Sequence, residues 1–342
     1  MRHILGASFA LLVGCGGHHA DPSSTAIAPV TEDAVFVVNG DDASLSVISV
    51  ATDEVVGTIK LGNVEYPHHV YLSSDGETML VAVPGADLSG GHSGGHGGHG
   101  DGGGAVVVLD ASTGALKAAR RLDAPNHNAI YAQDGSIWTT QIASPGEVLI
   151  LDPATLSTTS MLVAGNDPAE VTFSSAGTRA FVANTASDSV SVFDAASGAL
   201  IDTIAVGVGP VGAWPAADGN MYVDNETGKS LTVIDAATLV VEQTIALGFT
   251  PAVAAIAPNG ELWVTDTDNG KLVFLRASDG MKLGELATGA GAHAIAFSGD
   301  GAKAYVTNQL ANSVAVVDIA SKIVSETVTV GAKPNGIVFR GR

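Results

Sequence analysis

The chain has 342 residues and a formal net charge of −20, because 35 Asp and Glu outnumber 15 Lys and Arg. Such an acidic chain repels phosphate backbones, so we expect no nucleic-acid partner. Hydrophobic residues (46%) far exceed charged residues (15%), which excludes a disordered chain, and the single cysteine excludes an intrachain disulfide.

The amino terminus has the pattern of an export signal. Arg2 and His3 precede an apolar run, Ile4 to Val13, which is too short to cross a bilayer as a helix. The run ends in Leu12-Val13-Gly14-Cys15, and this ending resembles the lipobox of bacterial lipoproteins. The resemblance implies that residues 1–14 are a signal peptide and that Cys15 carries lipid. The alternative is an ordinary signal peptide followed by a chance cysteine.

The residue after the cysteine bears on the choice of membrane. Gly16 stands where retention in the inner membrane would favour Asp, so the resemblance implies an outer-membrane lipoprotein, on the periplasmic or the cell-surface side. Residues 15–33 are rich in Gly, Pro, Ser and Thr, and we expect them to form a flexible tether. The globular part then covers residues 34–342.

One unit recurs seven times along this globular part. Its most regular segment is an apolar strand of four residues, with copies that begin at Leu45, Val106, Val148, Val190, Leu231, Leu272 and Val314. A turn of the type Gly-x-x-Pro also recurs, at Pro67, Pro125, Pro168, Pro210, Pro251 and Pro334, with Ala292 in the remaining place. The successive spacings of these turn positions are 58, 43, 42, 41, 41 and 42 residues.

A repeat of about 41 residues with four short strands is the signature of a β-propeller blade. The chain starts at a second strand, Val35 to Asn39, and ends with a lone first strand, Asn335 to Phe339. The last strand fits the gap in the first blade and would remove two unpaired edges. The sequence therefore predicts an all-β, seven-bladed propeller of four-stranded blades, closed by the C-terminal strand.

The last complete repeat carries a family resemblance. It contains Tyr305-Val306-Thr307-Asn308, followed by Val317-Asp318 and by a Gly-x-x-Pro turn at Pro334. The chain is similar to the YVTN-type, surface-layer-like β-propeller repeat family, which is named for this tetrapeptide and includes lipid-anchored binding proteins. The resemblance implies the fold and export rather than an activity, because propellers host many functions.

The spacing of 58 residues exceeds the others because of an insert over residues 85–104. The insert is rich in glycine and carries His92, His96 and His99. Imidazoles on a flexible glycine chain suit Cu(II), Zn(II) or Ni(II), so we predict metal capture by this segment. The alternative is a low-complexity insertion without a ligand.

A second departure from the repeat lies in the two residues after each turn position. Five metal-competent side chains fall in these places, and they are His68, His69, His127, Glu170 and His293. All of these places begin an innermost strand, so the side chains should converge on the channel mouth. His69, His127 and Glu170 occupy the same place in three successive blades, and two His with one carboxylate suit zinc, copper or iron. Side-chain alternation leaves open whether His68 and His69 share one ion.

The topology of a four-stranded meander relates the two departures. The link between strands two and three lies on the same face as the link from strand four to the next blade. The insert is a link of the first kind, and the histidine positions follow links of the second kind. We therefore expect the insert to lie over the predicted site, as an arm that collects metal.

The favoured hypothesis is a lipid-anchored propeller that binds a transition metal, copper or zinc, for sequestration, sensing or delivery. One alternative is a metal-independent scaffold for an envelope protein. The other is a metal-dependent hydrolase or oxidoreductase, with Glu170 as ligand or base. Metal binding without catalysis is favoured. We expect the protein to be a monomer that attaches to the membrane through its lipid anchor and contacts an envelope protein.

Overall fold

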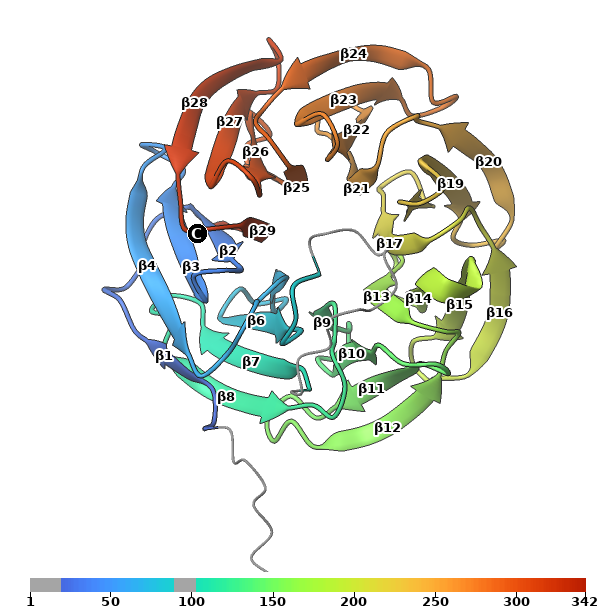
Figure 1. The fold of residues 1–342 in the computed structure, drawn as a ribbon, viewed down its shortest axis with the longest axis horizontal. Helices are drawn as coiled ribbons and strands as arrows, with labels where there is room; N and C mark the ends of the chain where they lie inside the picture. Colours follow the sequence, from blue (N-terminus) through green and yellow to red (C-terminus); the bar gives the residue numbers. More distant parts are fainter. Residues whose placement is uncertain (1–19, 89–102) are drawn as a thin grey trace, which may run out of the picture.

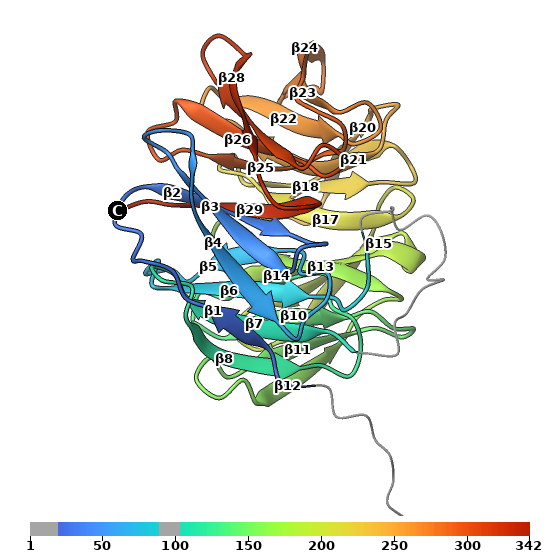
Figure 2. The ribbon, with the colours of Figure 1, turned by 60° about the vertical axis from the view of Figure 1, so that its left-hand side comes forward.

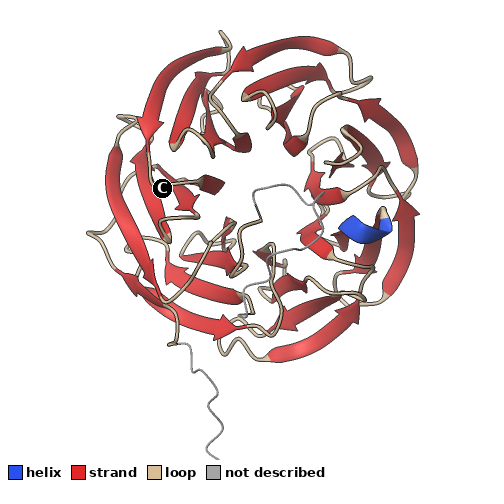
Figure 3. Cartoon of the chain, viewed as in Figure 1, coloured by secondary structure: helices blue, strands red, loops and turns tan. Residues whose placement is uncertain are grey.

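Seven antiparallel blades stand around one axis in the computed structural model, which describes residues 20–88 and 103–342 (Figure 1). Each blade has four strands, and a fifth strand extends one of them. Strands and loops make up almost all of the described chain, and Figure 3 shows one short 3-10 turn, η1 (Thr185–Ser187). The predicted fold class is therefore confirmed. Among the described residues, no helix has the length and hydropathy that a membrane span requires.

Six blades are consecutive meanders, in which the first strand lies innermost and the fourth outermost. Their strands, blade by blade, are β5 (Val70–Leu72), β6 (Thr78–Val83), β7 (Ala105–Asp110) and β8 (Leu116–Arg121); β9 (Ala129–Tyr131), β10 (Ile137–Gln141), β11 (Glu147–Leu151) and β12 (Thr158–Val163); β13 (Pro168–Phe173), β14 (Arg179–Asn184), β15 (Ser189–Asp194) and β16 (Leu200–Ala205); β17 (Pro210–Pro215), β18 (Asn220–Asn225), β19 (Ser230–Asp235) and β20 (Val241–Ala246); β21 (Pro251–Ile256), β22 (Glu261–Asp266), β23 (Lys271–Arg276) and β24 (Lys282–Ala287); β25 (Ala292–Phe297), β26 (Lys303–Asn308), β27 (Ser313–Asp318) and β28 (Ile323–Thr329).

The remaining blade joins the two ends of the propeller. It contains β2 (Ala34–Asn39), β3 (Ser44–Ser49) and β4 (Val55–Gly62), and its innermost strand is β29 (Pro334–Arg340). β29 pairs antiparallel with β2, with Val35 opposite Phe339 and Val37 opposite Ile337. The ring is thus closed by the C-terminal strand, as the lone first strand in the sequence predicts.

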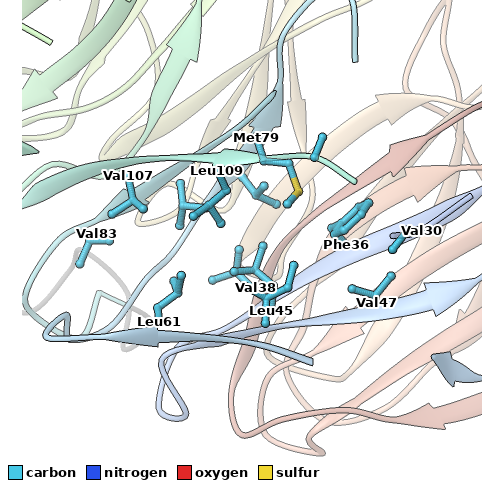
Figure 4. Packing of buried hydrophobic residues seen from close by; sticks show 14 of the residues in the cluster. Val30, Phe36, Val38, Leu45, Val47, Leu61, Met79, Val83, Val107 and Leu109 are labelled. Carbon is cyan, nitrogen blue, oxygen red and sulfur yellow. The ribbon is translucent and has the colours of Figure 1, made fainter. Parts of the chain in front are cut away.

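The second and third strands are buried on both faces because the neighbouring blades stack on them. All six residues of β2 and all six of β3 are buried. Figure 4 shows one such interface, where Phe36, Leu45 and Met79 meet between two blades. The outermost strands, such as β12, are largely exposed. This division explains why the third strand is the most regular apolar segment of the repeat.

The N-terminal segment differs from the expected flexible tether over residues 15–33. Residues 23–25 form β1 (Ser23–Thr25), which extends the first sheet by pairing with β4, as Figure 2 shows. Ile27 and Val30 then donate backbone hydrogen bonds of 2.8 Å to the next blade. Residues 20–33 are therefore packed on the propeller. The predicted signal peptide and Cys15 lie outside the described residues.

Candidate functional site

A bulge opens the innermost strand of five blades at the positions that the sequence singled out. In β13, two residues between Pro168 and Val171 lie opposite one residue of β14, and β17, β21, β25 and β29 show the same shift of register. Ahead of β5, Ala82 accepts a hydrogen bond from the N–H of His68 and donates one to the carbonyl of His69. A bulge interrupts the alternation of side chains, so two successive residues can turn toward the axis.

His68, His69 and His127 form a buried cluster at these bulges. Each ring offers one nitrogen, and the three nitrogens lie within 4.8 Å of one another. The ring centroids of His68 and His69 are 4.7 Å apart, and that of His127 lies 4.5 Å from His68. The three residues are at most 5% exposed. The bulge thus brings His68 and His69 to one point, although the alternation of a regular strand would separate them.

Glu170 lies against two of the three rings. Its Oε1 is 3.0 Å from Nε2 of His69 and 3.1 Å from Nδ1 of His127, and its side chain is 2% exposed. Asn128 donates to the other oxygen, Oε2, over 3.5 Å. Burial and the charge of Glu170 together raise the pKa of the neighbouring Tyr71, so this phenol stays protonated. A buried carboxylate is costly unless a positive charge compensates it, and a bound cation would supply that charge.

His293 completes the set at the edge of the cluster. Its ring centroid lies 5.7 Å from that of His68 and 6.4 Å from that of His69, and the residue is half-buried. Thr265 holds this backbone in place by donating a hydrogen bond of 2.7 Å to the carbonyl of His293. The structure therefore brings all five predicted residues of the channel mouth to one site.

A cavity of about 480 Å³ contains this site, and its lining shows on which face the insert lies. The lining includes Leu88, at the start of the insert, and Leu310, from the link between β26 and β27. These links therefore lie on the face of the histidine cluster, as the topology predicts. His92, His96 and His99 lie outside the described residues.

Sequence reasoning missed the wall that Trp214 forms. The indole Nε1 of Trp214 donates a hydrogen bond of 2.7 Å to Oδ1 of the buried Asp224, and the N–H of Gly212 donates to the same oxygen over 3.0 Å. A Cβ on Gly212 would lie 2.6 Å from Cζ2 of Trp214. The indole thus fills the place where the two preceding blades present His127 and Glu170.

Asp224 is itself a departure from the repeat. It occupies the place of Thr307 in the tetrapeptide Tyr-Val-Thr-Asn, and this replacement was the available signal in the sequence. Burial, and then the charges of Glu226 and Glu170, raise the pKa of the Asp224 carboxyl well above its usual range. The raised pKa favours the protonated form of this carboxyl.

Comparison with solved structures shows the fold. The periplasmic gluconolactonase PpgL of Pseudomonas aeruginosa is 19% identical and has a TM-score of 0.72, over 90% of this chain and 99% of that one. A putative 6-phosphogluconolactonase of Bacteroides fragilis is 15% identical with a TM-score of 0.72, over 91% and 99%. Apo AztD of Citrobacter koseri is 14% identical with a TM-score of 0.59, over 90% and 98%.

The sequence comparisons place the chain in a family. No curated protein sequence matches it. A family model described as the choice-of-anchor I domain matches residues 131–336, more than half of the 342 residues. The similarity to β-propellers is therefore confirmed, while the YVTN type stays a prediction. The chain belongs to the choice-of-anchor I domain family.

Proposed function

We propose that this protein is an exported, lipid-anchored propeller that binds a divalent transition metal, copper or zinc, for sequestration, sensing or delivery. The observation that carries the proposal is the buried cluster of His68, His69 and His127 with Glu170 against it. Imidazole nitrogens and a carboxylate oxygen are ligands that zinc and Cu(II) share.

The distances from Glu170 to two of the rings suit one shared ion. Two ligands that share a tetrahedral zinc at about 2.0–2.1 Å lie about 3.3 Å apart. The contacts of Glu170 with His69 and His127 measure 3.0 and 3.1 Å, close to that value. The buried carboxylate also gains from a cation, because its desolvation is otherwise costly. His293 lies near enough to add a donor after a change of rotamer.

The position of the insert supports a role in capture. Leu88 lines the same cavity as the histidine cluster, and His92, His96 and His99 follow it in the sequence after a few residues. A tether of a few residues gives a high effective concentration of imidazole at the mouth. The arm would pass metal to the cluster, and an envelope protein would receive it.

Export and anchoring rest on the N-terminal pattern that ends at Cys15. The similar gluconolactonase is described as periplasmic, which supports an extracytoplasmic location for this chain. We place the protein on the outer membrane, with the propeller as a monomer on the periplasmic or cell-surface side.

The test is elemental analysis of protein that lacks residues 1–15, after incubation with copper or zinc and removal of free ion. We expect close to one metal per chain, and a loss of at least tenfold in occupancy when His68, His69, His127 and His293 are all changed to Ala. Circular dichroism shows whether this variant keeps its strands, and Glu170→Gln is a milder second variant. Absence of metal from the unchanged protein would rule out the proposal.

A matched variant separates the arm from the cluster. With His92, His96 and His99 changed to Ala, we expect the bound metal to remain and its uptake to slow. If instead this variant loses the metal and the cluster variant keeps it, the site lies in the arm.

A hydrolase is the second candidate function, favoured by a cavity large enough for a substrate and by two similar structures described as lactonases. Metal-dependent hydrolysis of a sugar lactone that is lost in His127→Ala would support it. Metal-loaded protein without turnover would leave metal binding as the function.

A further inference from the structure

The cavity at the channel mouth is far larger than a metal ion needs. Its 480 Å³ equals the share of about 16 water molecules at roughly 30 Å³ each, and it falls in the usual range for sites of small molecules, about 300–1,000 Å³. The histidine cluster occupies one wall. The remaining space must therefore hold solvent or a second ligand.

The opposite wall is apolar and aromatic. Val211, Ala252 and Val253 line it together with Trp214. The indole is held in one orientation because Asp224 accepts its N–H and because Gly212 leaves room for the ring. A fixed aromatic face beside a cavity is a surface on which a planar ligand can stack.

The open side of the metal cluster faces this wall. His69, His127 and Glu170 come from successive blades, whereas the next two blades offer Gly212 and Val253 in the same place. An ion on the cluster would therefore have protein donors on one side only. A ligand from solution could complete its coordination from the side of Trp214.

The charges around the cavity select among such ligands. The carboxylates of Glu170, Glu226 and Asp268 outnumber the ammonium of Lys229, so the formal charge of the lining is negative. A divalent ion with one monoanionic chelator has a net charge of +1 and matches this lining. The hydroxyl oxygen of Thr267 is buried there without a hydrogen-bond partner among the described residues, and a polar group of the ligand would satisfy it.

We propose that the cavity binds its metal as a ternary complex, with the ion on the histidine cluster and a small planar, monoanionic N,O-chelator between the ion and Trp214. The inference rests on the proposed function, since it names the form in which the metal is bound. The class covers heteroaromatic carboxylates, in which a ring nitrogen and a carboxylate oxygen bind one ion.

The experiment uses Co²⁺ as the metal and pyridine-2-carboxylate as the chelator, with protein that lacks residues 1–15. The visible spectrum of bound Co²⁺ first reports metal binding alone, and the chelator is then titrated into the loaded protein. We expect a change in that spectrum and quenching of tryptophan fluorescence. Trp138 and Trp263 are at most 1% exposed, so Trp214 is the indole that a ligand in this cavity reaches.

Variants of the aromatic wall decide the outcome. Trp214→Leu should bind Co²⁺ as before and bind the chelator about tenfold more weakly, as expected when one stacked ring is lost. Trp214→Phe keeps a flat ring, so its affinity for the chelator should fall less than that of Trp214→Leu. Val208→Ala, at an exposed residue outside the cavity, is the control.

Three results would overturn the inference, and they can be told apart. Equal chelator affinity in Trp214→Leu and the unchanged protein removes the aromatic subsite. Extraction of Co²⁺ by the chelator shows that no ternary complex forms, and metal binding survives as the function in both cases. Absence of Co²⁺ binding from the unchanged protein, together with absence of copper and zinc in the elemental analysis, removes the proposed function as well.

Discussion

Asp224 shows how one replaced residue reorganises the channel. Elsewhere the corresponding threonines join neighbouring blades, for example Thr140 to the carbonyl of Ala169 over 2.7 Å and Thr307 to that of Asn335 over 2.9 Å. Asp224 instead accepts hydrogen bonds from Trp214 and Gly212 within its own blade. The change fixes the indole at the cavity, and its cost is a carboxyl group that is fully buried.

The buried carboxyl predicts how stability depends on pH. The pKa of Asp224 is raised by burial in the folded state, so above the unfolded pKa of about 4 only the folded state keeps the proton. Between the two pKa values this group lowers the free energy of unfolding by about 1.4 kcal/mol for each unit that the pH rises. Asp224→Asn keeps Oδ1 as acceptor and removes the titration, so its stability relative to the unchanged protein should rise with pH. Urea unfolding at pH 4 to 8 measures this difference, and parallel pH profiles would contradict the assignment.

At the scale of the element, β29 links the last residues of the chain to the first blade. Its residues pair with β2, and Asn335 accepts at its carbonyl from Thr307 of the preceding blade. Arg340 donates to the carbonyl of Gly76 over 3.0 Å and so reaches the blade beyond. One strand therefore stabilises three blades.

Removal of β29 should destabilise the whole ring. Deletion of residues 334–342 exposes the inner edge of β2 and two apolar faces, and we expect a loss of at least roughly 5 kcal/mol, comparable to the stability of many domains. Deletion of residues 341–342 alone is the control, because these residues follow the strand. Thermal unfolding followed by circular dichroism measures both. A truncated protein with the melting temperature of the control would show that the closure contributes little.

At the scale of the whole molecule, the same local interaction recurs in several blades of the ring. The aspartate at the end of the third strand accepts hydrogen bonds within its turn in five blades, at Asp110, Asp152, Asp194, Asp235 and Asp318. Burial raises the pKa of Asp110, but hydrogen bonds from Ser112 and Thr113 outweigh this effect and lower it to about 2. Hydrogen bonds to the carboxylate also lower the pKa values of the other four.

These five turns predict unfolding in acid. A carboxylate with a lowered folded pKa stabilises the protein above the unfolded pKa of about 4, and this contribution is lost as the pH falls through the folded pKa. We expect the free energy of unfolding to fall between about pH 4 and pH 2, and urea unfolding across this range measures it. Asp152→Asn keeps the acceptor oxygen and should make the fall less steep. A constant free energy over this interval would show that the turns contribute no pH dependence.

The sequence by itself determined the closed seven-bladed ring and which residues come together at the cavity. Seven copies of one unit must occupy equivalent places around an axis, so residues at one place in the repeat converge, and His68, His127, Glu170 and His293 do meet in the structure. The same logic predicted the pairing of the strand from Asn335 to Phe339 with the first blade and the face on which Leu88 lies. Periodicity carries this information because each blade repeats the same backbone path.

Only the tertiary structure decided the details that depend on contacts between segments distant in the sequence. The bulge opposite Ala82 turns His68 and His69 to one point, which the alternation of a regular strand does not predict. Ser23–Thr25 forms a strand because it pairs with the free edge of β4, although the composition of this segment predicts a flexible tether. Trp214 reached the cavity because Gly212 has no side chain and Asp224 binds its indole. Such contacts leave no periodic pattern, since each depends on the particular neighbours that folding brings together.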